Sequence, residues 1–173
     1  WSTAKATGDV IYAVGPQWYP WFGTMPDLFW VYRIDASGIL ERVTGAAYET
    51  VSHPDRSKFY TWRSKGGAFR LDRWTGDPLA VEATVLTLGE QVSMVTADEG
   101  TGHIFLHGFG AYGATTRGEV RGYDEAGTLL WTTTTVVRND YTQLVAKNGR
   151  VYVAGWVDHP ELDAGLLPGL IVL

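Results

Sequence analysis

The sequence contains no cysteine, which excludes disulfides, thiolate nucleophiles and cysteine-ligated zinc. Charged residues make up only 19% of the 173 residues and the formal net charge is −5, so we expect no nucleic-acid partner. No apolar run approaches the roughly 18–20 residues that a membrane-spanning helix needs, so we expect no membrane span. What remains is one globular domain or several small repeated units.

The chain is rich in β-branched residues and turn formers. Val, Ile and Thr together contribute 41 residues, and Gly and Pro contribute 28. Apolar residues reach 45% and aromatic residues 13%, which is enough for a packed core. This composition favours many short strands joined by tight turns over helices.

One pattern, a turn followed by alternating aromatic and aliphatic residues, occurs four times. The copies are Val10–Val14, Lys58–Trp62, His103–His107 and Arg150–Ala154. The turn before the last copy is Asn148-Gly149, which is typical of a hairpin because both positions accept positive φ. The central aromatic residues of the four copies, Tyr12, Tyr60, Phe105 and Tyr152, lie 48, 45 and 47 positions apart. A period of this length indicates that each copy belongs to one repeated structural unit.

Two other families of segments flank these copies. The segments that precede them are Ala4–Thr7, Ala47–Ser52, Val92–Ala97 and Tyr141–Ala146. The segments that follow are Trp30–Ile34, Ala68–Leu71 and Val120–Tyr123, which lead into turns at Asp35–Gly38, Asp72–Gly76 and Asp124–Gly127. An Asp that opens a turn closed by Gly is typical of a connection between strands, and a further strand follows each Gly. Each unit therefore reads as four strands, which we name A, B, C and D.

The predicted fold is all-β: a β-propeller of about four four-stranded antiparallel blades. The approximate blade boundaries are 1–43, 44–86, 87–137 and 138–173. Leu170–Leu173 matches strand C, so we expect the last blade to be incomplete. The chain is then a closed four-bladed ring, part of a larger propeller, or a piece completed by an oligomer or a second chain. The alternative fold is a β-sandwich with coincidental spacing.

Part of the chain resembles known propeller families. Arg150–Trp156 and Tyr123–Trp131 resemble the bacterial propeller repeats called SBBP or PQQ-like repeats. Val10–Val14 followed by Phe29–Arg33 is similar to the tachylectin-2 and tectonin lectin propellers. The lectin resemblance implies sugar binding between blades. We expect no quinone and no other cofactor, because four irregular blades do not match an eight-bladed dehydrogenase.

The long connections between strands B and C are the predicted functional surface, because variable loops on a rigid scaffold carry most binding residues. They are Gly15–Asp27, Gly108–Gly118 and Val157–Pro168, whereas the second blade has only Arg63–Gly67. Exposed Trp and Tyr rings favour stacking on sugars or hot spots for proteins. The alternative is that these rings plug the channel or cap a neighbouring blade. The predicted ligand-binding residues are Trp18, Tyr19, Trp21, Tyr112, Arg117, Trp156, Asp158, His159 and Glu161.

Metal sites are not expected. His103 and His107 would lie about 13 Å apart on a strand, too far to share one metal, so we interpret them as structural. Arg33, Arg70 and Arg121 recur in or near strand C, and we expect them to form ion pairs between blades.

Three functions remain open. The first is a non-catalytic module that binds a glycan or a protein through the B–C loops. The second is an extracellular glycoside hydrolase or lyase that uses Asp158, His159, Glu161 or Asp163 for proton transfer. The third is a scaffold that assembles through an open blade edge. We favour the binding module and expect it to be secreted or periplasmic.

Overall fold

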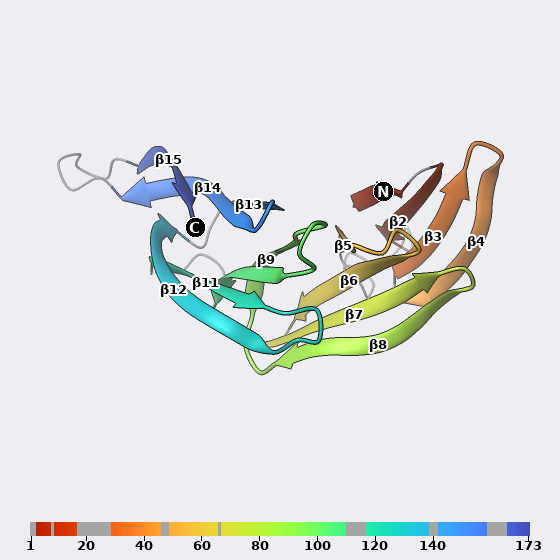
Figure 1. Cartoon of the computed structure of the whole chain (residues 1–173), viewed down its shortest axis with the longest axis horizontal. Coiled ribbons are helices and arrows are strands. Elements are labelled where there is room, and N and C mark those ends of the chain that lie inside the picture. The colour runs from red at the N-terminus through yellow and green to blue at the C-terminus, as the bar shows by residue number, and fades with distance from the viewer. Residues whose placement is uncertain are drawn as a thin grey trace, which may run out of the picture. The chain divides into compact units, whose positions relative to one another are not determined.

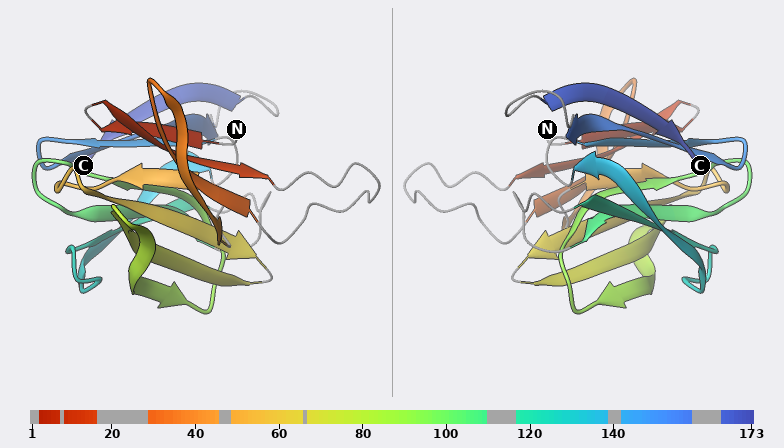
Figure 2. Two further views of the ribbon diagram at one scale, coloured as in Figure 1. Left: turned by 90° about the vertical axis from the view of Figure 1, so that its right-hand side faces the viewer. Right: turned by 90° about the vertical axis from the view of Figure 1, so that its left-hand side faces the viewer.

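The computed structural model describes residues 3–7, 9–16, 29–45, 49–65, 67–109, 117–138, 142–158 and 166–173. Every regular element within these ranges is a strand, and Figure 1 labels most of them along the chain. Two further views show the same strands, and no described segment forms a helix in either (Figure 2). The described residues accordingly contain no helix long and apolar enough to cross a bilayer. The strands are β1 (Thr3–Thr7), β2 (Val10–Pro16), β3 (Phe29–Asp35), β4 (Gly38–Gly45), β5 (Glu49–Ser52), β6 (Lys58–Lys65), β7 (Ala68–Gly76), β8 (Leu79–Leu88), β9 (Val92–Ala97), β10 (Ile104–Phe109), β11 (Arg117–Tyr123), β12 (Leu129–Arg138), β13 (Gln143–Lys147), β14 (Arg150–Asp158) and β15 (Leu166–Val172).

The chain divides into two compact units. The first unit consists of Trp1–Arg63 and Arg70–Leu86, and the second of Ser64–Phe69 and Thr87–Leu173. The first contains most of two four-stranded sheets, β1-β2-β3-β4 and β5-β6-β7-β8. In the second, β9–β12 form a third set of four neighbouring strands, and β13, β14 and β15 form a fourth set of three. The expected all-β pattern of blades with an incomplete last blade is confirmed for the described residues.

The core of the first unit follows from the alternation of side chains along β2 and β3. Tyr12 and Val14 of β2 point to the same face as Val31 of β3, which pairs with Val14. They pack against the second sheet, where the ring of Phe59 stacks on Tyr12 with 4.4 Å between centroids and lies 5.9 Å from the ring of Trp74. Strand order and period-two alternation thus place one face of each sheet against its neighbour within this unit.

The turn between β7 and β8 differs from the expected turn at Asp72–Gly76. Strand β7 continues to Gly76, and the turn occupies Asp77 and Pro78. Asp72 lies inside the strand, where its carboxylate accepts hydrogen bonds from Arg70 Nε at 2.8 Å and from Thr84 Oγ1 at 2.7 Å. The turn prediction was wrong because the buried Asp72 carboxylate is hydrogen-bonded to side chains of β7 and β8 and therefore does not open a turn.

The shifted turn docks on the first sheet. Arg33 of β3 donates to the carbonyl of Gly76 at 3.1 Å and forms an ion pair with Asp77 at 2.8 Å. Glu41 of β4 accepts the N–H of Leu79 at 2.9 Å. The predicted ion pair between blades is therefore confirmed for Arg33.

The second unit has its own core between the third and fourth sets of strands. Leu144, Val151 and Val153 of β13 and β14 pack in one cluster with Phe105 and Val120. The two sets are also joined by backbone pairing, since Val137 at the end of β12 pairs with Val157 of β14.

The turn between β13 and β14 is the hairpin turn that the sequence predicted. Asn148 has φ 55° and Gly149 has φ 75°, the two positive values that an Asn-Gly hairpin turn requires. The N–H of Gly149 donates to the buried carboxylate of Asp98, which follows β9. The fourth set of strands is therefore tied to the third at its turn as well as through its core.

Candidate functional site

Most of the predicted site residues lie outside the described residues. This holds for Trp18, Tyr19, Trp21, Tyr112, His159 and Glu161, and also for Asp163 of the catalytic alternative. For Arg117 and Asp158 the structure describes the backbone, and for Trp156 it describes the side chain as well. The predicted set as a whole stays a prediction, and the described strands establish where its members are attached.

In the second unit, strand register brings together the strand ends that flank two of the long B–C connections. Arg117 pairs with Arg138 at the start of β11, and the adjacent Val137 pairs with Val157 of β14. Asp158, next to Val157, pairs with Leu166. Neighbouring strands lie about 4.8 Å apart and the rise along a strand is about 3.3 Å per residue, so the register separates the backbones of Arg117 and Asp158 by about 12 Å across β12. We call this group of strand ends, Arg117, Arg138, Trp156–Asp158 and Leu166, the B–C edge of the second unit.

Trp156 is the aromatic side chain described at this edge. It is 38% exposed, whereas Val157 beside it packs against the core cluster. Its cross-strand partner is Pro168, which is also exposed. An exposed indole beside a proline offers a flat apolar surface with an N–H donor, a combination that suits a sugar face or a protein loop.

Close approach of the strands beneath this edge depends on two glycines. A Cβ on Gly155 of β14 would lie 2.7 Å from Val137 Cγ1. A Cβ on Gly118 of β11 would overlap the imidazole of His107 and lie 2.5 Å from the carbonyl oxygen of Val137. Only residues without a side chain fit at these positions, so the backbone geometry of the edge is tightly determined.

His107 lies in the core next to the B–C edge. It is fully buried on β10 and pairs with Met94 and Val120, and neither ring nitrogen has a hydrogen-bond partner among the described residues. Burial lowers its pKa from 6.5 to about 4, so the ring is neutral at pH 7. The structural interpretation of His107 agrees with this burial. What the sequence did not reveal is that the ring packs on Gly118.

The charged groups near this edge are paired with one another. Arg121 Nε donates to Glu119, its Nη1 donates to Glu90, and its guanidinium carbon lies 3.7 Å from the ring centroid of Phe109. Burial alone would lower the pKa of Arg121, but the hydrogen bonds to Glu90 and Glu119 raise it above its ordinary value. A guanidinium engaged in this way is not free to bind an anionic ligand.

The expectation of ion pairs between blades is wrong for two of the three arginines. Arg70 pairs with Asp72 of its own strand at 2.8 Å. Arg121 pairs with Glu119 of its own strand and with Glu90, which directly precedes β9 of the same blade. Residues two apart on a strand share a face, and this local geometry accounts for both same-strand pairs.

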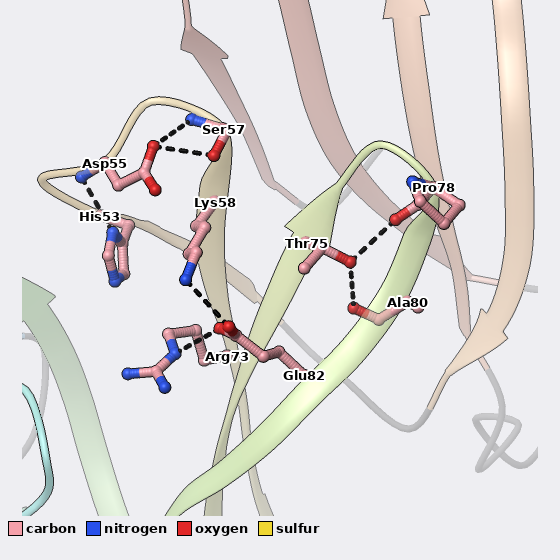
Figure 3. A network of polar contacts seen from close by, with 9 residues as sticks. All are labelled: His53, Asp55, Ser57, Lys58, Arg73, Thr75, Pro78, Ala80 and Glu82. Atoms are coloured by element: carbon pink, nitrogen blue, oxygen red, sulfur yellow. Dashed lines mark hydrogen bonds and ion pairs between the residues drawn. The ribbon is translucent and has the colours of Figure 1, made fainter.

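A polar network on the second sheet is likewise satisfied internally (Figure 3). Glu82 of β8 accepts from Lys58 at 2.9 Å and from Arg73 at 2.7 Å, and these hydrogen bonds lower its pKa. Asp55 accepts from the N–H and hydroxyl of Ser57 within one turn. Among the described residues no group of three or more His, Asp or Glu side chains could hold a metal ion.

The comparisons with known proteins establish the fold. No family model matches the chain, and no curated protein matches it. Among solved structures, it superposes on the β-propeller domain of the Trilobed protease from Pyrococcus furiosus with a TM-score of 0.69 and 8% identity, covering 98% of this chain and 52% of that one. It superposes on hydrazine synthase from Kuenenia stuttgartiensis with a TM-score of 0.72 and 12% identity, covering 98% of this chain and 49% of that one. For a luciferin-regenerating enzyme the TM-score is 0.55 and the identity 13%, and the superposition covers 98% of this chain and 59% of that one.

The chain thus spans about half of the length of the first two of these solved chains. Identities of this size report on fold and not on activity. Together with the repeated sheets, these superpositions show that the chain has a β-propeller fold.

Proposed function

We propose that this chain is a non-catalytic binding propeller whose ligand, a glycan or a protein, contacts the B–C connections. The proposal rests mainly on one observation, the register that brings Arg117, Trp156 and Asp158 to one edge of the second unit. The edge combines an exposed indole with a cationic and an acidic residue on a glycine-fixed backbone. Those are the elements of a specific contact surface: an aromatic anchor with polar groups around it.

Composition of the connections adds support. The B–C connection of the first blade carries Trp18, Tyr19 and Trp21 within four positions, and that of the third carries Tyr112. Trp and Tyr side chains supply large contact areas and lose little conformational entropy on binding, which favours a role in contacting a ligand. A ligand-binding role of this kind accords with the secreted or periplasmic location that we also propose.

The experiment is a glycan array followed by titration calorimetry of every glycan that binds, and a panel of candidate protein ligands is tested in the same way. We expect Trp156→Ala to weaken binding at least tenfold and Trp156→Phe to retain most of the affinity, because the aromatic face is kept. Val81→Ala is the control, since Val81 is exposed on β8 and distant in sequence from every B–C connection. Binding that is unaffected by Trp156→Ala would contradict a role for the B–C edge of the second unit.

A second readout distinguishes binding from catalysis. Each glycan that binds is incubated with the chain and the products are analysed. We expect no turnover. Cleavage that disappears in Asp158→Asn or Glu161→Gln, with folding retained, would replace the binding module by the glycoside hydrolase or lyase alternative.

A further inference from the structure

The repeat places one equivalent aromatic residue in each blade, and three of the four are buried. Tyr12, Tyr60 and Phe105 are 5%, 0% and 2% exposed. Tyr152, at the same position of the last blade, is only half-buried. The face of a blade that carries this residue is covered in the first three blades and incompletely covered in the fourth.

The face in question is formed by alternate residues of β13, β14 and β15. Val145 pairs with Tyr152, and Tyr152 pairs with Val172, so the three lie in one row across the sheet. Leu170 lies in the next row, opposite Ala154. Their exposed fractions are 55% for Val145, 50% for Val172 and 65% for Leu170. We call these residues, with Tyr152 and Ala154, the outer face of the last blade.

The opposite face of the same strands is already packed. Leu144, Val151 and Val153 are 6%, 1% and 0% exposed and belong to the core cluster of the second unit. A sheet that is apolar on both faces is typical of one buried between two layers, whereas a sheet with one solvated face alternates apolar with polar residues. The sequence of these strands is therefore that of a blade with a neighbour on each side.

The chain also offers a complementary face. In the second unit, the face with Phe105 packs against Val151 of the following blade. The residue of the first blade equivalent to Val151 is Ile11, which is 39% exposed and pairs with Ile34. Ile39 at the start of β4 is 57% exposed. The first sheet thus presents apolar residues on the face that corresponds to the Val151 face of the last blade. In the second unit, the Val151 face packs against the preceding blade.

We propose that the outer face of the last blade binds a second copy of this chain, which contacts it with the Ile11 face of its first sheet. This contact between two copies would have the same arrangement as the contact between the Phe105 and Val151 faces within one chain. The chain covers 52% and 49% of the propeller chains on which it superposes. A head-to-tail pair in which both contacts form leaves neither of these two faces uncovered.

The first test is the mass of the 173-residue chain in solution, by sedimentation equilibrium between about 1 and 100 µM, a range that spans modest association constants. We expect a species of twice the 19.1 kDa chain mass. Val145→Lys and Leu170→Lys should each lower the association constant at least tenfold. Their matched controls, Val81→Lys and Leu129→Lys, change valine and leucine residues that are 45% and 52% exposed on other strands, and they should leave it unchanged. A monomer throughout, or a dimer equally strong in all four variants, would overturn the proposal.

A mixing experiment tests the head-to-tail geometry. Val145→Lys damages only the outer face and Ile11→Lys only the complementary face, so each variant alone should be monomeric. An equimolar mixture retains one intact contact and should recover association. Dimerisation of Ile11→Lys alone, or a mixture that stays monomeric, would contradict this pairing of faces.

A third measurement covers the case in which a lysine variant does not fold. Because the chain has no cysteine, Leu170→Cys and Ile39→Cys each introduce a single thiol, and both positions are exposed. A short bismaleimide should link the two variants into a species of twice the chain mass when they are mixed. Val81→Cys mixed with Ile39→Cys should not give this product, and equal yields in both mixtures would overturn the proposal.

Discussion

His107 gives the stability of the protein a pH dependence that can be worked out from one side chain. Its pKa is about 4 in the folded chain because of burial, against 6.5 when the chain is unfolded. Well above pH 6.5 the ring is neutral in both the folded and the unfolded chain, so it adds no pH dependence to the free energy of unfolding. Between pH 6.5 and about 4 the unfolded chain binds a proton that the folded chain does not, so the free energy of unfolding falls as the pH falls. The full difference corresponds to about 3 kcal/mol.

Urea unfolding from pH 7 to pH 4 measures this slope, and His107→Leu should reduce it. The slope is the readout, because the substitution also changes packing and hence the absolute stability. Circular dichroism at pH 7 checks that the variant is folded. An unchanged slope in His107→Leu would mean that other groups control stability in this pH range.

Gly118 is the residue on which the packing of His107 depends. A Cβ there would overlap the imidazole and approach the Val137 carbonyl, so Gly118→Ala should lower the free energy of unfolding by about 1–3 kcal/mol. Gly89→Ala is the matched control, because a Cβ at Gly89 meets no atom within 4 Å and should change stability by less than about 0.5 kcal/mol. Equal effects of the two substitutions, measured by urea unfolding, would refute the tight contact.

At the scale of elements, one carboxylate links two hairpins. Asp98, 2% exposed after β9, accepts from the N–H of Gly149 in the β13–β14 turn and from the N–H of Gly100 at 2.8 Å. Burial alone would raise its pKa, but these backbone hydrogen bonds hold it below the ordinary value. The stabilisation from this carboxylate is therefore present above pH 3.8 and is lost as the pH falls through the lower pKa of the folded chain.

Asp98→Asn should accordingly lower the free energy of unfolding by about 1–3 kcal/mol. Amide hydrogen exchange should show the loss where it occurs, at the N–H of Gly149. Asp124→Asn is the control, because Asp124 accepts from the N–H groups of Ala126 and Thr128 in its own turn and should leave the exchange of Gly149 unchanged. Loss of protection at Gly149 in both variants would contradict a specific link between the hairpins.

The elements could be predicted where local chemistry alone decides the backbone. Asn148-Gly149 predicted a hairpin because both residues accept positive φ, and both have it. The turn prediction at Asp72 was wrong because the sequence alone does not distinguish an Asp inside a strand from an Asp that opens a turn. The partners of Asp72, Arg70 and Thr84, are recognisable only once β7 and β8 are aligned, although Gly76-Asp77-Pro78 was an available turn signal.

The candidate site could be predicted only in part, for a related reason. The B–C connections follow from the repeat, and so does the place of Trp156 near the end of strand B. The pairing of Val137 with Val157, which brings together the strand ends that flank two connections, joins strands of different repeat units. A period of about 47 positions defines each unit but carries no information about the register between units.

At the scale of the whole molecule, the repeat implies that stability is divided among contacts between successive blades. Two clusters illustrate this: Tyr12 and Phe59 stack in one, and Phe105 belongs to the other. Energetic coupling is expected between residues that touch and not between residues of separate clusters.

Double-mutant cycles test this division. Tyr12→Leu and Phe59→Leu should show a coupling of about 0.5–1.5 kcal/mol, because the second substitution loses a stacking contact that the first has already removed. Tyr12→Leu and Phe105→Leu remove residues without a shared partner, so their effects on the free energy of unfolding should add to within about 0.5 kcal/mol. Urea unfolding of the three single and two double variants gives both values. Equal coupling in the two cycles would mean that the clusters respond as one core, and the description of the chain as separately packed blades would fail.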